Sequence, residues 1–160
     1  MNRLRKLLRL PVTDRFLLIR AVVLLGVVRV GLWLLPFKKL QRLLSQVQTR
    51  ARSWNKGRFR TERGIWAVQV ASRYALRTTC LTRALAAQVL LGFDGITASV
   101  RIGVAKEKEG ELEAHAWLER DGRILLGGSH AEQKYVPMLS VIYGSVSSEP
   151  STLGGGNTKI

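Results

Sequence analysis

The chain has 160 residues, with 26 lysines and arginines against 11 aspartates and glutamates, which gives a formal charge of +15. This length suits one domain with an appendage, but it is too short for two full hydrophobic cores. An apolar content of 46% excludes a disordered basic tail protein. The single cysteine excludes an intramolecular disulfide framework and a cysteine-cluster zinc site, and it leaves a reactive thiol open.

The positive charge is concentrated in the first 60 residues. They contain 15 basic residues and one acid, Asp14, whereas residues 61–160 contain 11 basic and 10 acidic residues. We therefore expect three segments: basic, leucine-rich helices over residues 1–60, a core domain over residues 61–145, and a flexible tail rich in serine and glycine over residues 146–160.

The stretch from Phe16 to Phe37 is rich in leucine and valine, but Arg20 and Arg29 interrupt it. The uncharged runs on either side of Arg29 are eight residues long. A membrane-spanning helix needs about 20 apolar residues, and a central arginine costs about 2.5–3.5 kcal/mol. No small-residue cleavage site follows, so we expect no secretion signal. The pattern predicts one or two helices packed on the body of the protein, with a break at Pro36.

The function of this basic segment has more than one interpretation. It can form solvated helices that cover a core, or a surface for an acidic peptide, a partner protein or the anionic inner membrane leaflet. Nucleic acid ranks low, because the basic residues alternate with leucine and valine and no aromatic stacking platform is visible. We expect a cytoplasmic protein without a nucleic-acid partner, and we leave peripheral membrane contact open.

The only cysteine lies at the predicted start of a helix. Residues Leu81 to Leu91 are mostly strong helix formers, and Thr78 or Thr79 is a natural N-cap. Cys80 is then in the first turn, where the helix dipole and the free amide groups favour a thiolate, which is the nucleophilic form. A lone cysteine in a helix is also a common core residue, so this placement alone is not specific.

Three strand-like stretches follow, over Thr97–Val104, Glu111–Glu119 and Ile124–Leu126, with a tight-turn signal at Asp121-Gly122. They predict an antiparallel meander behind the cysteine-bearing helix. In the second stretch, side chains of one face alternate with those of the other: Leu112, Ala114, Ala116 and Leu118 against Glu113, His115, Trp117 and Glu119. A histidine on a strand next to the cysteine could act as its general base.

Three segments together resemble a known family. They are Cys80-Leu-Thr-Arg-Ala, Val100-Arg-Ile-Gly-Val104 and Ala114-His-Ala-Trp-Leu-Glu119, in this order. They resemble the transglutaminase-like cysteine peptidases of lasso peptide biosynthesis, and in particular their discrete peptidase subunit, the B2 protein. The resemblance covers roughly residues 13–136. It implies an α+β, papain-like or transglutaminase-like fold, with the cysteine-bearing helix packed on a small antiparallel sheet and basic helices at the N-terminus.

The resemblance also implies an activity. Cys80 would attack the scissile carbonyl of a precursor peptide, and hydrolysis of the acyl-enzyme would release the leader, with His115 as general base and then general acid. The implied partners are the precursor leader peptide, a separate winged-helix leader-recognition protein of the B1 type, and an ATP-dependent lasso cyclase. The alternative function is a non-catalytic or membrane-associated accessory protein that docks partners through its basic helices. Neither a cofactor nor a metal is expected, because the sequence shows no metal-ligand set and no phosphate-binding loop.

The third catalytic position departs from the family pattern. Many relatives have an acid about a dozen residues after the histidine, where this chain has Gly127. Asp121 is the nearest acid and is a candidate to orient His115, although Asp-Gly at a hairpin tip is usual turn chemistry. A Cys–His pair without an acid, or a third group of another kind, remains open.

Two further residues are candidates for contact with the substrate. Arg83 lies one turn after Cys80 and could bind a peptide carbonyl, or it could pair with an acid. Trp117 follows His115 on the same strand face and could shield the site, or it could pack in the core. His130 is expected at the surface.

Overall fold

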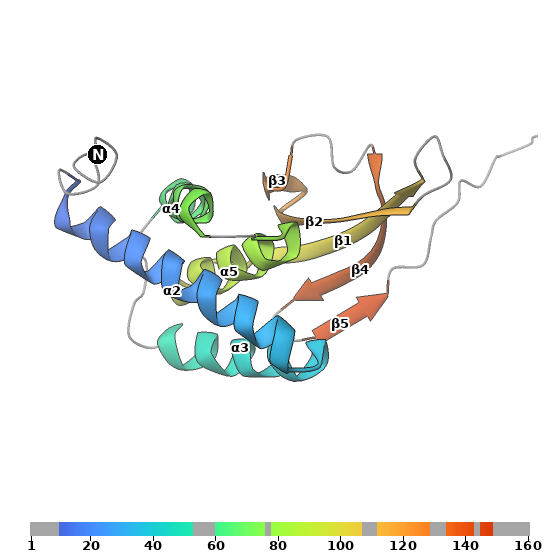
Figure 1. Cartoon of the computed structure of the whole chain (residues 1–160), viewed down its shortest axis with the longest axis horizontal. Helices are drawn as coiled ribbons and strands as arrows, with labels where there is room; N and C mark the ends of the chain where they lie inside the picture. Colours follow the sequence, from blue (N-terminus) through green and yellow to red (C-terminus); the bar gives the residue numbers. More distant parts are fainter. Residues whose placement is uncertain are drawn as a thin grey trace, which may run out of the picture.

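The computed structural model describes residues 10–52, 60–75, 78–106, 112–128, 134–142 and 145–148. Helices precede strands along the chain, as expected for the predicted α+β class (Figure 1). The helices are α2 (Val12–Leu34), α3 (Phe37–Arg52), α4 (Thr61–Tyr74) and α5 (Cys80–Phe93). The strands are β1 (Ser99–Lys106), β2 (Leu112–Arg120), β3 (Arg123–Leu126), β4 (Val136–Ile142) and β5 (Ser145–Ser148). Pro36 separates α2 from α3, as the sequence predicts.

The strands form one antiparallel sheet in the order β3-β2-β1-β4-β5. The predicted meander of β1, β2 and β3 is confirmed, and Gly103 of β1 lies opposite His115 of β2. Asp121 and Gly122 both have positive φ angles, +49° and +72°, which is the conformation that a two-residue hairpin turn requires.

Helix α5 is the centre of the fold. It packs on β1 and β2 with one side and on α2, α3 and α4 with the others, so it lies between the sheet and the helical layer (Figure 1). Every residue from Ala84 to Gly92 is buried. A helix that is apolar all round is stable in water only when neighbours cover it on all sides, and this arrangement supplies them.

The two faces of the sheet belong to different hydrophobic clusters. Val100, Ala116 and Leu118 face the helices and join the main core. Because side chains alternate along a strand, Trp117 points to the other face, where it packs with Ala105 and Tyr135 in a second, smaller cluster. The two faces that the sequence predicts for β2 are the ones observed.

The N-terminal helices are part of this core. Helix α2 packs on α4 and α5, and the buried carboxylate of Asp14 forms an ion pair with Arg63 of α4. Strand β5 (Ser145–Ser148) overlaps the first residues of the stretch predicted as a flexible tail. Strand β5 pairs with β4 through backbone N–H and C=O groups, and a serine-rich segment has these groups like any other segment. Residues 149–160 and His130 lie outside the described residues.

Candidate active site

Cys80 is the first residue of α5. The N-cap is Thr79, one of the two predicted candidates, and its Oγ1 accepts a hydrogen bond from the backbone N–H of Thr82 at 3.2 Å. The other candidate, Thr78, instead donates to the carbonyl of Ser72 at 3.3 Å, which ties the start of α5 to the end of α4. The thiol is free and half-buried. Helix geometry leaves the N–H groups of Cys80 and Leu81 without a partner inside the helix, so they are available to an anion.

His115 lies on β2, and its ring has two defined contacts. Nε2 is 2.7 Å from the carbonyl oxygen of Gly127, and the ring stacks on Tyr135 with 4.9 Å between centroids and 25° between planes. A carbonyl oxygen can only accept a hydrogen bond, so Nε2 carries the proton in the neutral ring. The lone pair is then on Nδ1, which is the nitrogen that can act as a base.

Gly127 lies twelve residues after His115, at the position where the sequence resemblance led us to expect an acid. Position 127 therefore does contact the histidine, but the contact is made by its main-chain carbonyl and not by a side chain. Its φ angle is +116°, and a Cβ atom there would lie 2.5 Å from Cβ of Trp117 and 2.8 Å from its Cα. Both the backbone conformation and the contact with Trp117 exclude a side chain at this position. The missing acid thus has a structural reason.

Asp121 is not brought to His115. It lies at the tip of the β2–β3 hairpin with 83% of its side chain exposed, and it pairs with Arg120 at 3.2 Å. Six residues of extended strand separate it from His115, about 20 Å. The expectation that Asp121 orients the histidine is corrected here, because the hairpin geometry carries its carboxylate away from the ring that Gly127 binds.

Trp117 is a packing residue. It is 1% exposed and lies in the second cluster, and a Cβ at Gly103 would come within 3.0 Å of its ring. The expectation that Trp117 contacts substrate is therefore corrected, since its ring is covered by protein. Its indole N–H has no hydrogen-bond partner among the described residues.

An ion pair lies on the same side as the histidine ring. Nζ of Lys134 donates to the carboxylate of Glu113 at 2.6 Å and lies 5.1 Å from the ring centroid of Tyr135, on which His115 stacks. The hydrogen bond to Glu113 raises the pKa of Lys134, so this ammonium stays protonated across the neutral range. The surroundings of the ring thus include one fixed cation and its counter-ion.

The two principal candidates, Cys80 and His115, have different surroundings in this structure. Helix α5 packs on β2, but Cys80 lies against the main core, whereas the ring of His115 lies with Tyr135 and Trp117 on the opposite face of the sheet. No hydrogen bond joins the sulfur of Cys80 to the His115 ring among the described contacts. The structure therefore gives each group its local setting and leaves them unpaired.

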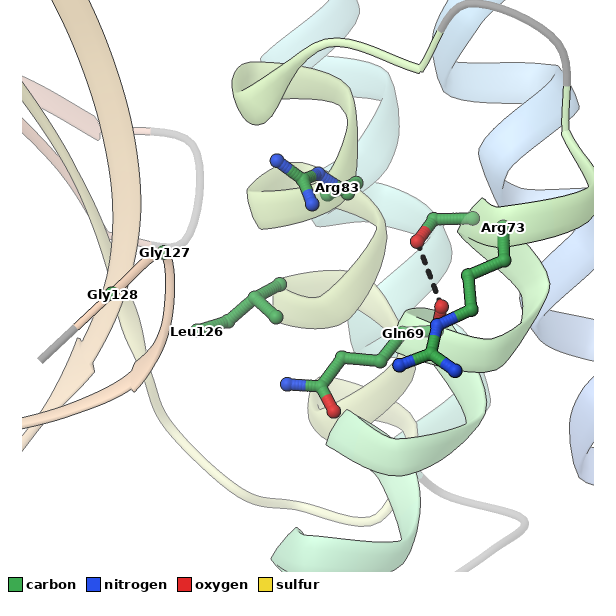
Figure 2. A pocket seen from close by; sticks show the side chains of 7 residues that line it. Gln69, Arg73, Arg83, Leu126, Gly127 and Gly128 are labelled. Carbon is green, nitrogen blue, oxygen red and sulfur yellow. Dashed lines mark hydrogen bonds between the residues drawn. The ribbon is translucent and has the colours of Figure 1, made fainter.

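A cavity of about 480 Å³ opens between α4, α5 and the end of β3 (Figure 2). Its lining combines polar groups of the two helices with the backbone after β3: Gln69, Ser72, Arg73, Arg83, Leu126, Gly127 and Gly128. Figure 2 shows the side chain of Arg83 directed from α5 toward the chain at Gly127 and Gly128. Its Nε is buried without a hydrogen-bond partner. The alternative that Arg83 pairs with an acid is not seen among the described residues.

Cys80, His115, Arg83 and position 127 are candidates from the sequence, whereas the cavity-lining residues Arg73 and Gln69 were missed there. These two side chains come from α4 and meet Arg83 only because α4 packs beside α5. Within the described ranges, no group of three or more histidine, cysteine, aspartate or glutamate side chains could hold a metal ion.

The comparisons with known proteins gave one result. A model of the transglutaminase-like superfamily matches residues 22–140. Neither the comparison with curated proteins nor that with solved structures gave a significant match. The matched range begins within α2 and extends into β4, so it includes Cys80, His115 and Gly127.

Proposed function

The chain belongs to the transglutaminase-like superfamily, and on this basis we propose that it is a cysteine peptidase that removes the leader from a lasso peptide precursor. Membership in the superfamily supports cysteine chemistry in general terms. The finer assignment comes from the resemblance of the segments around Cys80, Val100 and His115 to the B2 peptidases. The observation that carries it is the ring of His115, held in one tautomer by position 127 of the chain.

In the proposed reaction, Nδ1 of His115 accepts the thiol proton of Cys80 and the thiolate attacks the scissile carbonyl. The N–H groups at the start of α5 would stabilise the oxyanion. The protonated ring then donates its proton to the leaving amine of the core peptide. Water, deprotonated by the same ring, hydrolyses the thioester that holds the leader, so that the enzyme returns to its starting state.

This chemistry requires the His115 ring to reach the side of the sheet on which Cys80 lies. The described pairing of β3 with β2 covers Leu118 to Arg120, so His115 is beyond it, near the open edge of the sheet. Without substrate, catalytic hydrogen bonds are often long or poorly aligned, and they tighten only when the substrate binds. The proposal therefore includes a rearrangement at this edge when the precursor binds.

The cavity beside Gly127 is the proposed binding site for part of the substrate. Two guanidinium groups, those of Arg73 and Arg83, line it, and the described lining residues include no acid. Guanidinium groups bind carboxylates through paired, charge-assisted hydrogen bonds. We therefore assign the cavity to an acidic group of the precursor. The winged-helix recognition protein and the ATP-dependent cyclase are proposed as the proteins that deliver this precursor and consume the product.

A cleavage assay tests the proposal. The protein is incubated with precursor and recognition protein, and leader release is followed by mass spectrometry. Wild type should release the leader, Cys80→Ala should lose all activity, and Arg83→Gln should raise KM more than it lowers kcat. If wild type and Cys80→Ala leave the same amount of precursor intact, the peptidase assignment fails.

The rate of thiol alkylation gives a second test that needs no substrate. If Cys80 and His115 pair in solution, the ring of His115 activates the thiol, so His115→Ala should slow the alkylation of Cys80 by iodoacetamide at neutral pH. Equal alkylation rates for wild type and His115→Ala would show that the two groups do not pair in the free protein.

A second candidate function follows from the separation of Cys80 and His115. A member of the superfamily without an assembled pair and with glycine at position 127 could serve as a non-catalytic protein that docks partners through its basic helices. In that case neither wild type nor Cys80→Ala releases the leader, and the recognition protein or the cyclase binds both in a pull-down assay.

A further inference from the structure

Helix α2 has an exposed apolar face along its whole length. Its large apolar side chains with about half or more of their surface exposed, from 48% to 86%, are Val12, Phe16, Ile19, Val22, Val23, Val27, Val30, Trp33 and Leu34. Figure 1 shows α2 on the outside of the helical layer. Contiguous apolar patches of this extent on a protein surface mark an interaction site.

Most of these side chains form a single stripe. Val12, Phe16, Ile19, Val23, Val27, Val30 and Leu34 follow one another at intervals of three or four residues, which places them on one side of the helix. The stripe is about 33 Å long at 1.5 Å per residue. The opposite side of α2 is packed in the main core, where Leu17, Ala21, Leu25 and Val28 are at most 1% exposed. One side of α2 therefore has apolar side chains buried in the core, and the other side has apolar side chains exposed to solvent.

Arginine side chains flank the exposed stripe, and no acid lies on it. At 100° per residue, Arg29 and Arg20 project at its two edges, and Arg20 lies 4.5 Å over the ring of Phe16. Asp14, the only acid in residues 1–60, is on the buried side and paired with Arg63. An apolar face with cationic edges is the pattern of a helix that lies in the plane of a lipid surface, with its arginines at the headgroups.

We propose that the protein binds an anionic lipid surface through this stripe, with α2 lying flat in the headgroup region. The first 60 residues contain 15 basic residues and one acid, and an anionic surface attracts this positively charged end of the chain. Trp33, the most exposed of these side chains, is of the type enriched at membrane interfaces.

A flat orientation fits the structure better than a spanning one. Helix α2 is long and apolar enough to cross a bilayer by length and composition. Crossing would pull Leu17, Ala21, Leu25 and Val28 out of their contacts with α4 and α5 and would bury Arg20 and Arg29 in hydrocarbon. In the flat orientation, the core stays intact and both arginines remain at the headgroups.

Vesicle flotation tests the proposal with a matched control. The double variant Val23→Glu/Val30→Glu places two carboxylates on the stripe at half-exposed positions, so the core is not disturbed. Leu112→Glu is the control. It also replaces an exposed apolar side chain with glutamate, but Leu112 lies on β2, where it is 74% exposed. Circular dichroism melting of each variant confirms that it folds. The lipids are phosphatidylcholine alone, or phosphatidylcholine mixed with phosphatidylglycerol.

Wild type and Leu112→Glu should float with the anionic vesicles and not with phosphatidylcholine alone, and the double variant should bind at least tenfold more weakly. High salt should weaken binding of wild type. Failure of wild type to float, or equal binding by the double variant, overturns the proposal. If the stripe instead mediates self-association, wild type forms dimers that the double variant lacks and does not bind vesicles, which also overturns it. Resistance of bound protein to carbonate extraction would overturn the flat orientation.

Discussion

An acid at position 127, which the resemblance to the lasso peptide peptidases led us to expect, should damage this protein. We predict that Gly127→Asp lowers the free energy of unfolding and gives no gain in peptidase activity. The substitution forces a residue other than glycine to adopt a φ angle of +116°, and it brings a Cβ atom to 2.5 Å from Cβ of Trp117. Trp117 is buried and cannot move away freely, so the main chain at position 127 must move and take its carbonyl away from His115.

The magnitude has two parts. A positive φ angle at a residue other than glycine costs about 1–3 kcal/mol. Overpacking against a fixed core side chain adds about 1–3 kcal/mol. Gly128 is a matched control, because its φ angle is +102° and a Cβ there meets no atom within 4 Å. Gly128→Asp therefore has the first cost without the second, and Gly127→Asp should be less stable by about 1–3 kcal/mol.

Urea denaturation and thermal melting measure this difference. For a protein of this size each kcal/mol corresponds to about 2–4 °C in Tm, so Gly127→Asp should melt about 2–12 °C below Gly128→Asp. The leader-release assay is run on both variants at a temperature where both are folded. Equal stability of the two variants, or faster cleavage by Gly127→Asp than by wild type, would refute the reasoning about Trp117 and the Gly127 carbonyl.

Three further predictions concern the residues that position the site. Thr79→Ala should lower the free energy of unfolding by about 1 kcal/mol, because the cap on Thr82 N–H is lost, while Thr79→Asn retains most of it; urea denaturation measures both, and equal losses would argue against the cap. Nitrogen-detected NMR at pH 8 should show the Nε2–H tautomer of His115, and a proton on Nδ1 would contradict the bond to the Gly127 carbonyl. Asp14→Ala should cost about 1.5–3 kcal/mol, since a charged hydrogen-bonded pair with Arg63 is lost; a double-mutant cycle with Arg63→Ala should show coupling, and additive effects would mean that the pair does not stabilise the fold.

The strands that the sequence failed to predict have identifiable reasons. Strand β4 contains Pro137, which has no N–H to donate and weakens a strand pattern. In the sheet, the β1–β4 register shifts between Ile102 and Gly103, next to the position of Pro137, so the irregularity accommodates the proline. Strand β5 contains three serines among its four residues and forms by pairing with β4, which is a contact with no local signal.

The sequence by itself determined the features that depend on neighbouring residues. The Thr79 cap that places Cys80 in the first turn, the Asp121-Gly122 turn and the alternation of β2 all follow from local conformational preference and periodicity. These signals extend over a few residues, so they can be read without knowledge of the fold.

Only the tertiary structure decided which groups meet. The bond of His115 to a main-chain carbonyl has no side-chain signature, and Arg73 joins Arg83 through the packing of two helices. The same holds for α2, whose sequence is apolar around most of its circumference. Packing against α4 and α5 covers one side and leaves the other in solvent. Burial is favourable for every apolar side chain, but the arrangement of the other elements determines which of these side chains are buried.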